Sequence, residues 1–340
     1  MRFVTFLAGV LATTGVFAHP GHDIAQEIAE RKAGLQMVSH RSLDHCTEVI
    51  KRSGLEARLV ARRNELADRL IKKRGLVGKT HLFTAQKRAD PINTSHKFSY
   101  NWNLDTPASV IFASNRSCIL SPEVTEGPYY LTGEYIREDL VENQAGVDLY
   151  MDILVLDTKT CKPVPNVYVE IWQTNSTGVY GGVIAQGNGN FADKTNNKKS
   201  WLRGAQKTTE DGVVSFGTLF PGHYTGRTTH THVMVHPNAV ALANGTIKDT
   251  TASHVGQFFF DQDLITLVEK QSPYSTNKQA LTTNAKDGIL QQSSKSGDPF
   301  INYIYLNGKD VMGGLLGWIS FGIDTSLTKT VRPAGQFTGH

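Results

Sequence analysis

From residue 118 onward, apolar and polar positions alternate in short segments bounded by Gly, Pro and Asn. Segments such as VDLYMDILVLDT (147–158), VYVEIWQT (167–174) and HTHVMVH (230–236) have the two-residue period of a strand with one buried face. Many short strands separated by turn residues are typical of an antiparallel β-sandwich. The pattern therefore predicts a mainly β fold over residues 116–330, with long loops.

The residues before this region have a different period. Between residues 23 and 74, leucines recur near the helical spacing among charged residues, after a capping Asp23 and with stops at Gly54 and Gly75. This predicts a basic amphipathic helical arm over residues 19–75. Its apolar face must pack either on the main domain or on a second copy of the chain, so a homodimer through the arm is one expected assembly.

The remaining segments carry weaker signals. Residues 76–115 show no sustained period and are expected to form an irregular connection, and residues 331–340 a C-terminal tail. Residues 1–18 have the charged, apolar and small-residue regions of a secretory signal peptide, and the apolar run is too short for a membrane span. We therefore expect a secreted protein. Candidate glycosylation sequons occur at Asn93, Asn115, Asn175 and Asn244.

The charge and the cysteines refine this picture. Residues 20–75 carry 12 Lys/Arg against 8 Asp/Glu, which accounts for the net charge of +4. Because acids are interspersed, we interpret the arm as a solvated helical face and expect no nucleic-acid partner. The three cysteines allow at most one internal disulfide in an oxidising compartment. We predict Cys118–Cys161, since both lie in the β-rich region, with Cys46 free or cross-linked elsewhere.

The stretch GRTTHTHVMVHP (226–237) contains three histidines. Strand alternation places His230 and His232 on one face, where two imidazoles can chelate one ion. A His-x-His pair alone also occurs in zinc sites, in copper sites and by chance. His236 follows the expected end of the strand, and we interpret it as a surface histidine.

Two tyrosines near this stretch narrow the choice of metal. Tyr180 follows a strand on a Gly-rich loop, and Tyr224 lies six residues before His230. Phenolate oxygen is a hard base that suits Fe(III) better than zinc or Cu(I). Each tyrosine alone is more often a packed aromatic. Together with the histidine pair, they indicate a ferric site.

With these residues the chain resembles the intradiol ring-cleavage dioxygenases, and within them the secreted fungal branch. The resemblance rests on TEGPYYL (125–131), on residues 152–180 and 207–235, and on HVGQFFFDQ (254–262). It implies a non-haem enzyme with one Fe(3+) per chain, which uses O2 to cleave a catechol- or hydroxyquinol-type small molecule between its hydroxylated carbons. The implied product is a muconate-type diacid, and the implied metal ligands are Tyr180, Tyr224, His230 and His232.

The resemblance also implies roles for residues around the metal. Tyr224 would be the ligand that leaves when substrate binds and accepts a proton from it. Arg227 would stabilise negative charge near the reacting carbon. Gln257 would lie next to the metal ligands without binding the metal itself, and Tyr129 would line the substrate pocket.

Two other interpretations stay open. The segment DTKTCKPVPNVYVEIW (157–172) also fits transthyretin-like modules, which are non-catalytic sandwiches that bind or scaffold. After signal cleavage, His19 could chelate copper as the amino-terminal residue of an oxygenase. The joint presence of two tyrosines and the histidine pair favours the iron enzyme over both.

Overall fold

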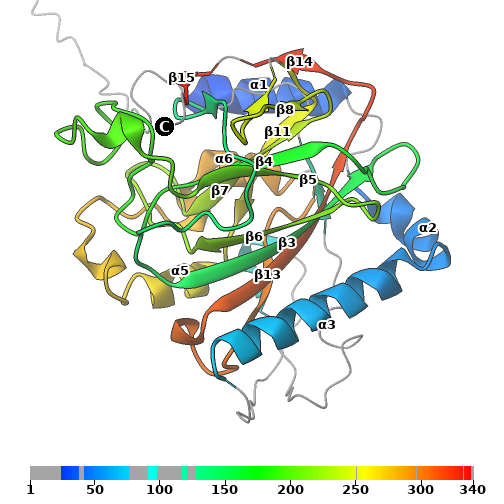
Figure 1. The fold of residues 1–340 in the computed structure, drawn as a ribbon, viewed down its shortest axis with the longest axis horizontal. Coiled ribbons are helices and arrows are strands. Elements are labelled where there is room, and N and C mark those ends of the chain that lie inside the picture. Colours follow the sequence, from blue (N-terminus) through cyan, green and yellow to red (C-terminus); the bar gives the residue numbers. More distant parts are fainter. Residues whose placement is uncertain are drawn as a thin grey trace, which may run out of the picture.

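The computed structural model describes residues 24–37, 42–76, 91–97, 117–120, 127–249, 251–295, 297–331 and 333–337. The predicted signal peptide, His19, Asn115 and most of the connection over residues 76–115 lie outside these ranges. Within them, two β-sheets pack face to face and helices cover the outside (Figure 1). No helix in the described part of the chain is long and apolar enough to cross a bilayer. The predicted mainly β sandwich is confirmed.

The first sheet is built around β13. β3 pairs with β13 in parallel on one side, and β6 pairs with β3 in an antiparallel ladder. The other side of β13 is shared by β12, which is antiparallel, and β1, which is parallel. This sheet is therefore mixed, whereas the sequence predicted an antiparallel one. The two-residue period could not distinguish the two, because parallel and antiparallel ladders share it. Its strands are β1 (Ser117–Ile119), β3 (Asp148–Asp157), β6 (Val213–Leu219), β12 (Asn302–Tyr305) and β13 (Leu315–Ile323).

The second sheet is antiparallel throughout, in the order β11-β7-β4-β5. Val233 and Val235 of β7 point into the main core, where they join β3 residues such as Met151 and Ile153. The histidines of β7 alternate with these valines and lie on the opposite, outer face. The strands are β4 (Tyr168–Trp172), β5 (Arg203–Lys207), β7 (His230–His236) and β11 (His254–Phe259).

The helical arm packs on its own chain. Leu66 and Leu70 of α3 contact Leu316 and Trp318 on the outer face of the first sheet. Gly54, at φ +69°, separates α3 from α2, as its position in the sequence predicted. Of the two packing alternatives, the main domain is therefore the one observed for this face. The arm consists of α1 (Ile24–Met37), α2 (Thr47–Arg52) and α3 (Leu55–Lys73).

The basic residues of α3 are not all solvated, which corrects the interpretation of the arm as a solvated face. Arg63 is fully buried, and its Nε lies 3.2 Å from Asp152 Oδ2 on β3. Arg62 Nε lies 2.9 Å from the other oxygen of the same carboxylate. The buried Asp152 carboxylate requires positive partners, and these arginines supply them. Part of the positive charge of the arm is therefore neutralised inside the protein.

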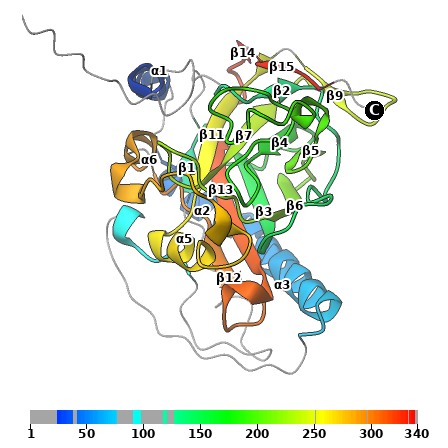
Figure 2. The same ribbon diagram turned by 90° about the vertical axis from the view of Figure 1, so that its left-hand side faces the viewer.

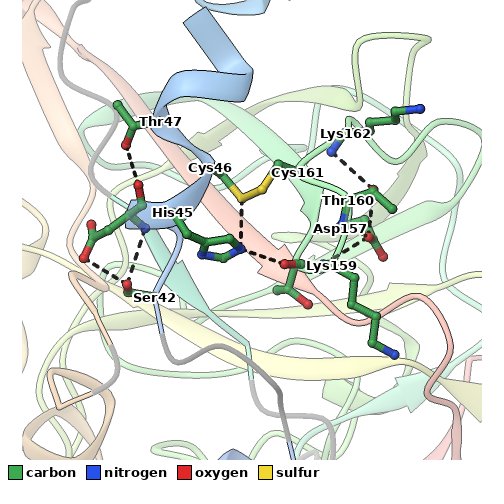
Figure 3. Close-up of a disulfide and its surroundings, with 11 residues drawn as sticks. Ser42, His45, Cys46, Thr47, Asp157, Lys159, Thr160, Cys161 and Lys162 are labelled. Atoms are coloured by element: carbon green, nitrogen blue, oxygen red, sulfur yellow. Dashed lines mark hydrogen bonds between the residues drawn. A yellow bond between two sulfur atoms is a disulfide. The ribbon is translucent and has the colours of Figure 1, made fainter.

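The disulfide joins Cys46 to Cys161, with 5.1 Å between the Cα atoms (Figure 3). The predicted Cys118–Cys161 pair is wrong. Cys46 lies between the arm and the sandwich, in an apolar cluster that includes Leu154 and Leu156 of β3. Cys118 instead lies in β1, where its backbone pairs with Phe321. The prediction failed because it treated the arm as a separate region, whereas the arm is docked on the sheet that ends near Cys161.

The remaining elements form the rim of the sandwich. The predicted C-terminal tail contributes a short strand, β15, which pairs in parallel with β2. Helix α1 packs beside α6, as the turned view shows (Figure 2). These elements are β2 (Leu131–Thr132), β8 (Val240–Ala241), β9 (Ile247–Lys248), β10 (Thr251–Ala252), β14 (Lys329–Thr330), β15 (Gly335–Gln336), α5 (Gln262–Val268) and α6 (Gly288–Ser293).

Candidate metal centre

Three neighbouring strands of the second sheet align the centre of the site. In the antiparallel ladders Trp172 of β4 is opposite His232 of β7, and Gln257 of β11 is opposite His232 on the other side. Residues directly opposite each other share a face of the sheet. His230, two residues before His232, is on this face as well. The ladder therefore gathers these side chains on the outer surface of the sandwich.

The four predicted ligand side chains converge. His230 Nε2 lies 3.1 Å from His232 Nε2, 3.3 Å from Tyr224 Oη and 3.5 Å from Tyr180 Oη. All four residues are buried, at most 4% exposed. Ligand atoms that are each about 2 Å from one ion lie about 3 Å from one another. The geometry thus fits a single ion held by two phenol oxygens and two imidazole nitrogens.

The contacts of the histidines orient their Nε2 atoms. His230 Nδ1 lies 2.6 Å from the carbonyl oxygen of Thr228, so it donates there and leaves the Nε2 lone pair for a metal. The ring of His232 stacks on the indole of Trp172, with centroids 4.7 Å apart and an angle of 7° between the planes. This stacking restricts the rotation of the imidazole. Neither contact was predicted from the sequence, although Trp172 stands in the strand motif.

Tyr180 is placed by a tight loop. Gly178 has φ +76°, and a Cβ there would lie only 2.0 Å from the carbonyl oxygen of His223, so only glycine fits this approach. The backbone N–H of Tyr180 donates to Asn188 Oδ1 over 2.6 Å. The ring of Tyr129 stacks on that of Tyr180 at 4.7 Å. Tyr129 therefore packs against one of the candidate ligand tyrosines, and its role in lining a substrate pocket stays a prediction.

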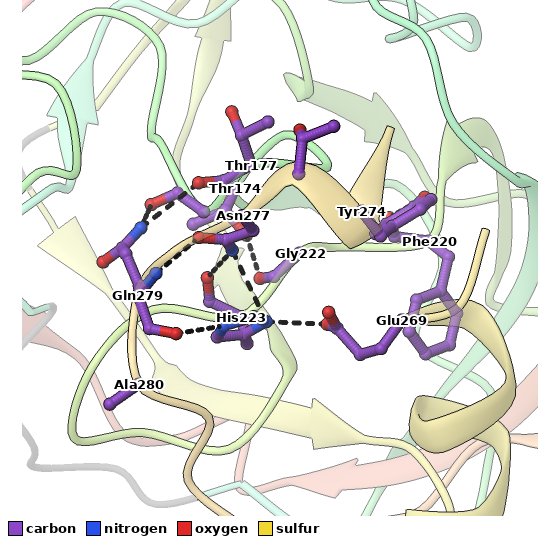
Figure 4. Close-up of polar contacts among 12 residues, drawn as sticks. Thr174, Thr177, Phe220, Gly222, His223, Glu269, Tyr274, Asn277, Gln279 and Ala280 are labelled. Atoms are coloured by element: carbon purple, nitrogen blue, oxygen red, sulfur yellow. Dashed lines mark hydrogen bonds and ion pairs between the residues drawn. The ribbon is translucent and has the colours of Figure 1, made fainter. Parts of the chain in front are cut away.

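The loop that carries Tyr224 is fixed through its neighbour His223 (Figure 4). His223 Nδ1 lies 2.8 Å from Glu269 Oε1, and Nε2 lies 2.9 Å from the carbonyl oxygen of Gln279. Asn277 donates to the carbonyl oxygen of His223 over 2.8 Å. Burial lowers the pKa of His223, but the bonds to Glu269 and Gln279 outweigh burial and raise it overall. The polar segment that carries Glu269, Asn277 and Gln279 thus fixes the loop next to Tyr224.

Burial keeps both phenols of the site neutral in the absence of a cation. Removal from water raises the pKa of Tyr180 to about 12 and that of Tyr224 well above its ordinary value. A bound metal ion favours the deprotonated ligand. Two phenolates suit a hard, highly charged ion, so the donor set fits Fe(III).

Arg227 lies beside the four donors and is 1% exposed. Its Nη2 donates to Gln257 Oε1 over 2.5 Å, which brings the two predicted catalytic residues together. Its Nε donates to Asp287 Oδ2 over 2.8 Å. Asp287 was not predicted, because it stands in a polar segment without periodicity. Gln257 Nε2 is buried and meets no acceptor within the described ranges, so it is available to a bound molecule.

His236 is buried, which corrects its interpretation as a surface residue. It is 1% exposed, and its Nε2 lies 2.9 Å from Glu170 Oε2. Its Nδ1 lies 3.2 Å from the carbonyl oxygen of Thr251. Strand β7 continues to His236 itself, and β10 packs beside its end. As predicted, however, His236 is not among the converging donors.

Comparison with known proteins gives three findings. The sequence model of a family described as "Dioxygenase" matches residues 125–284. An intradiol ring-cleavage dioxygenase from Tetranychus urticae, of known structure, is 33% identical; the match covers 61% of this chain and 95% of that one, with a TM-score of 0.48. The third is catechol 1,2-dioxygenase 1 of Acinetobacter lwoffii, which is 31% identical over 109 residues, 31% of this chain and 32% of that enzyme. The chain thus spans about a third of this curated relative.

Proposed function

Because this chain belongs to the intradiol ring-cleavage dioxygenases, we propose that it inserts both atoms of O2 into a catechol-type diol. The ring would open between the two hydroxylated carbons and give a muconate-type diacid. The observation that carries the proposal is the convergence of two tyrosines and two histidines on one buried point. No feature of the described residues favours a non-catalytic transthyretin-like scaffold over this enzyme.

We assign one non-haem Fe(III) per chain to Tyr180, Tyr224, His230 and His232. Bound there, the ion would supply the Lewis acidity that activates a catecholate towards O2. Each imidazole presents its Nε2 to the same point, and each phenol presents its Oη. All four side chains are buried, which would limit the access of water to the ion.

The protein supplies the acid–base and electrostatic parts of the reaction. As an ionised iron ligand, Tyr224 would present a phenolate Oη that can accept a proton from a diol hydroxyl, and burial favours its return to the neutral phenol. The Arg227 guanidinium stabilises negative charge that develops on the ring and on the oxygens derived from O2. Gln257 Nε2 can donate to a substrate oxygen, while its Oε1 holds Arg227.

We also infer that the protein is secreted. A disulfide between Cys46 and Cys161 suits an oxidising compartment, and the sequons at Asn93 and Asn244 are exposed. The third described sequon is less suited to glycosylation, because the side-chain amide of Asn175 donates from Nδ2 to Gln144 over 3.1 Å. A homodimer remains a prediction, and it would need a surface other than the face of α3 that packs on Leu316 and Trp318.

The proposal is tested with purified, iron-loaded protein. We expect a burgundy colour from tyrosinate-to-iron charge transfer and O2 uptake with catechol. His232→Ala should abolish both. Tyr180→Phe should weaken the band, because Tyr224 alone would remain as a phenolate ligand, whereas Tyr150→Phe, at a partly buried tyrosine beside α3, should retain the colour and the O2 uptake. A panel of catechol, hydroxyquinol and larger phenols would define the substrate. A colourless, iron-free protein that takes up no O2 would refute the proposal and favour the scaffold.

A further inference from the structure

Helix α1 buries an acidic side chain while its three alanines face solvent. Glu27 is 2% exposed, whereas Ala25, Ala29 and Ala33 are exposed. Burying a carboxylate is unfavourable unless positive charge or hydrogen bonds compensate it. The surroundings of Glu27 should therefore explain why α1 lies where it does.

Ile28, the residue after Glu27, holds α1 beside the metal centre. Ile28 packs on an apolar cluster that includes Phe259 of β11 and Ile289 of α6. The contact is close, because a Cβ on Gly288 would lie 2.8 Å from Ile28 Cδ1. The ring centroid of Phe259 is 6.1 Å from that of His230. Helix α1 therefore lies over the edge of the site, next to α6 (Figure 2).

The charge of Glu27 acts on two residues of the site. Burial is the main cause of the raised pKa of Tyr180, and the negative charge of Glu27 raises it further. Burial lowers the pKa of Arg227, but the negative charges of Asp287 and Glu27 contribute to raising it overall. Two carboxylates, from α1 and from the start of α6, thus act on one buried guanidinium. Glu27 therefore makes this space less favourable for an additional anion than a neutral side chain would.

We propose that Glu27 is a specificity-determining residue, which disfavours catechols with an anionic substituent and favours uncharged or cationic ones. The inference rests on the proposed function. A diol bound at the tyrosines and histidines would have Arg227 beside it, and its ring substituents would extend towards α1, which packs at the edge of the site. A ring carboxylate there would repel the Glu27 carboxylate with little screening by water or salt, and an ammonium group would be attracted.

The test measures equilibrium binding without turnover. Iron-loaded, full-length protein is titrated anaerobically with catechol, anionic 3,4-dihydroxybenzoate and cationic 3,4-dihydroxyphenethylamine, and the change in the visible band gives each dissociation constant. We expect the wild-type protein to bind catechol at least about tenfold more tightly than the benzoate. Glu27→Gln should bring the two constants within about threefold. Glu27→Asp should retain the preference.

Glu30→Gln is the matched control, because Glu30 is a partly exposed acid on the same helix and should leave the preference unchanged. An unchanged preference in Glu27→Gln would overturn the inference. If Glu27→Gln lowered the dissociation constants of all three compounds by the same factor, the inference would also be overturned. Helix α1 would then only restrict access to the site. If no compound alters the spectrum of any variant, including the wild type, it is the proposed function that fails.

Discussion

Arg227 Nε donates to Asp287 Oδ2 over 2.8 Å, and the same oxygen accepts the backbone N–H of Thr228, also over 2.8 Å. The other oxygen, Oδ1, accepts the backbone N–H of Leu290 over 2.8 Å and caps α6. One buried carboxylate therefore joins the guanidinium, the residue whose carbonyl orients His230, and the start of a helix. The position of Arg227 relative to the four donors depends on this carboxylate.

Replacing Asp287 by Asn should impair the reaction more than metal binding. The amide keeps the shape but loses the charge that pairs with Arg227, so we expect kcat to fall by about 10- to 100-fold. The iron content and visible band should remain near those of the wild type. Asp263→Asn, at an exposed acid on α5, is the control. Loss of iron in parallel with activity would show that Asp287 supports the metal site as a whole.

Removing the disulfide should lower stability without changing the site. The bond joins residues 115 positions apart, so it restricts the unfolded chain strongly. The double variant Cys46→Ser with Cys161→Ser should lose about 2–5 kcal/mol of unfolding free energy. Denaturant titration measures this loss, and the visible band of the iron-loaded protein serves as the control. Equal denaturation midpoints with and without the bond would contradict the prediction.

Alternation predicted the sandwich and placed His230 and His232 on one face. The resemblance to the intradiol dioxygenases, rather than a local pattern, implied Tyr180 and Tyr224 as their partners. The errors have another origin. Cys46 approaches Cys161 only because α2 and α3 dock on the first sheet. The roles of Asp287 and Glu27 depend on where α6 and α1 pack, which no local period encodes.

The stability of the protein should fall as the medium becomes alkaline. His96 is buried between Asp261 and Asp298. Burial lowers its pKa, but the bonds to these carboxylates outweigh burial and raise the pKa to about 9. Because this exceeds the unfolded value of about 6.5, the stabilisation is complete below about pH 6.5 and is lost as the pH rises through 9.

Thermal unfolding at pH 6 and pH 9.5 tests this expectation. His236, whose pKa is also raised to about 9, contributes in the same window, so the comparison is between wild type and His96→Gln. The melting temperature of the variant should depend less on pH than that of the wild type. Parallel curves would show that His96 contributes nothing to the pH dependence.

Iron loading should release protons, and the affinity of the protein for iron should therefore increase with pH. The phenols of Tyr180 and Tyr224 have pKa values raised by burial, so both are neutral before the metal binds. Each proton displaced makes binding more dependent on pH. Calorimetric titration in buffers of different ionisation enthalpy counts the protons. Tyr180→Phe should release one fewer, and an identical count in the variant would exclude Tyr180 as an ionised ligand.

Strand β13 lies in the middle of the first sheet, although it comes late in the sequence. On the ribosome, none of its ladders with β1, β3 or β12 can be completed until residue 323 has emerged. Until then, β3 is paired only with β6 and exposes an apolar edge that can join other chains. The face that carries the four candidate ligands stands on a core that is completed only after residue 323 has been made. The nascent chain must therefore be kept from aggregating until β13 closes the sheet.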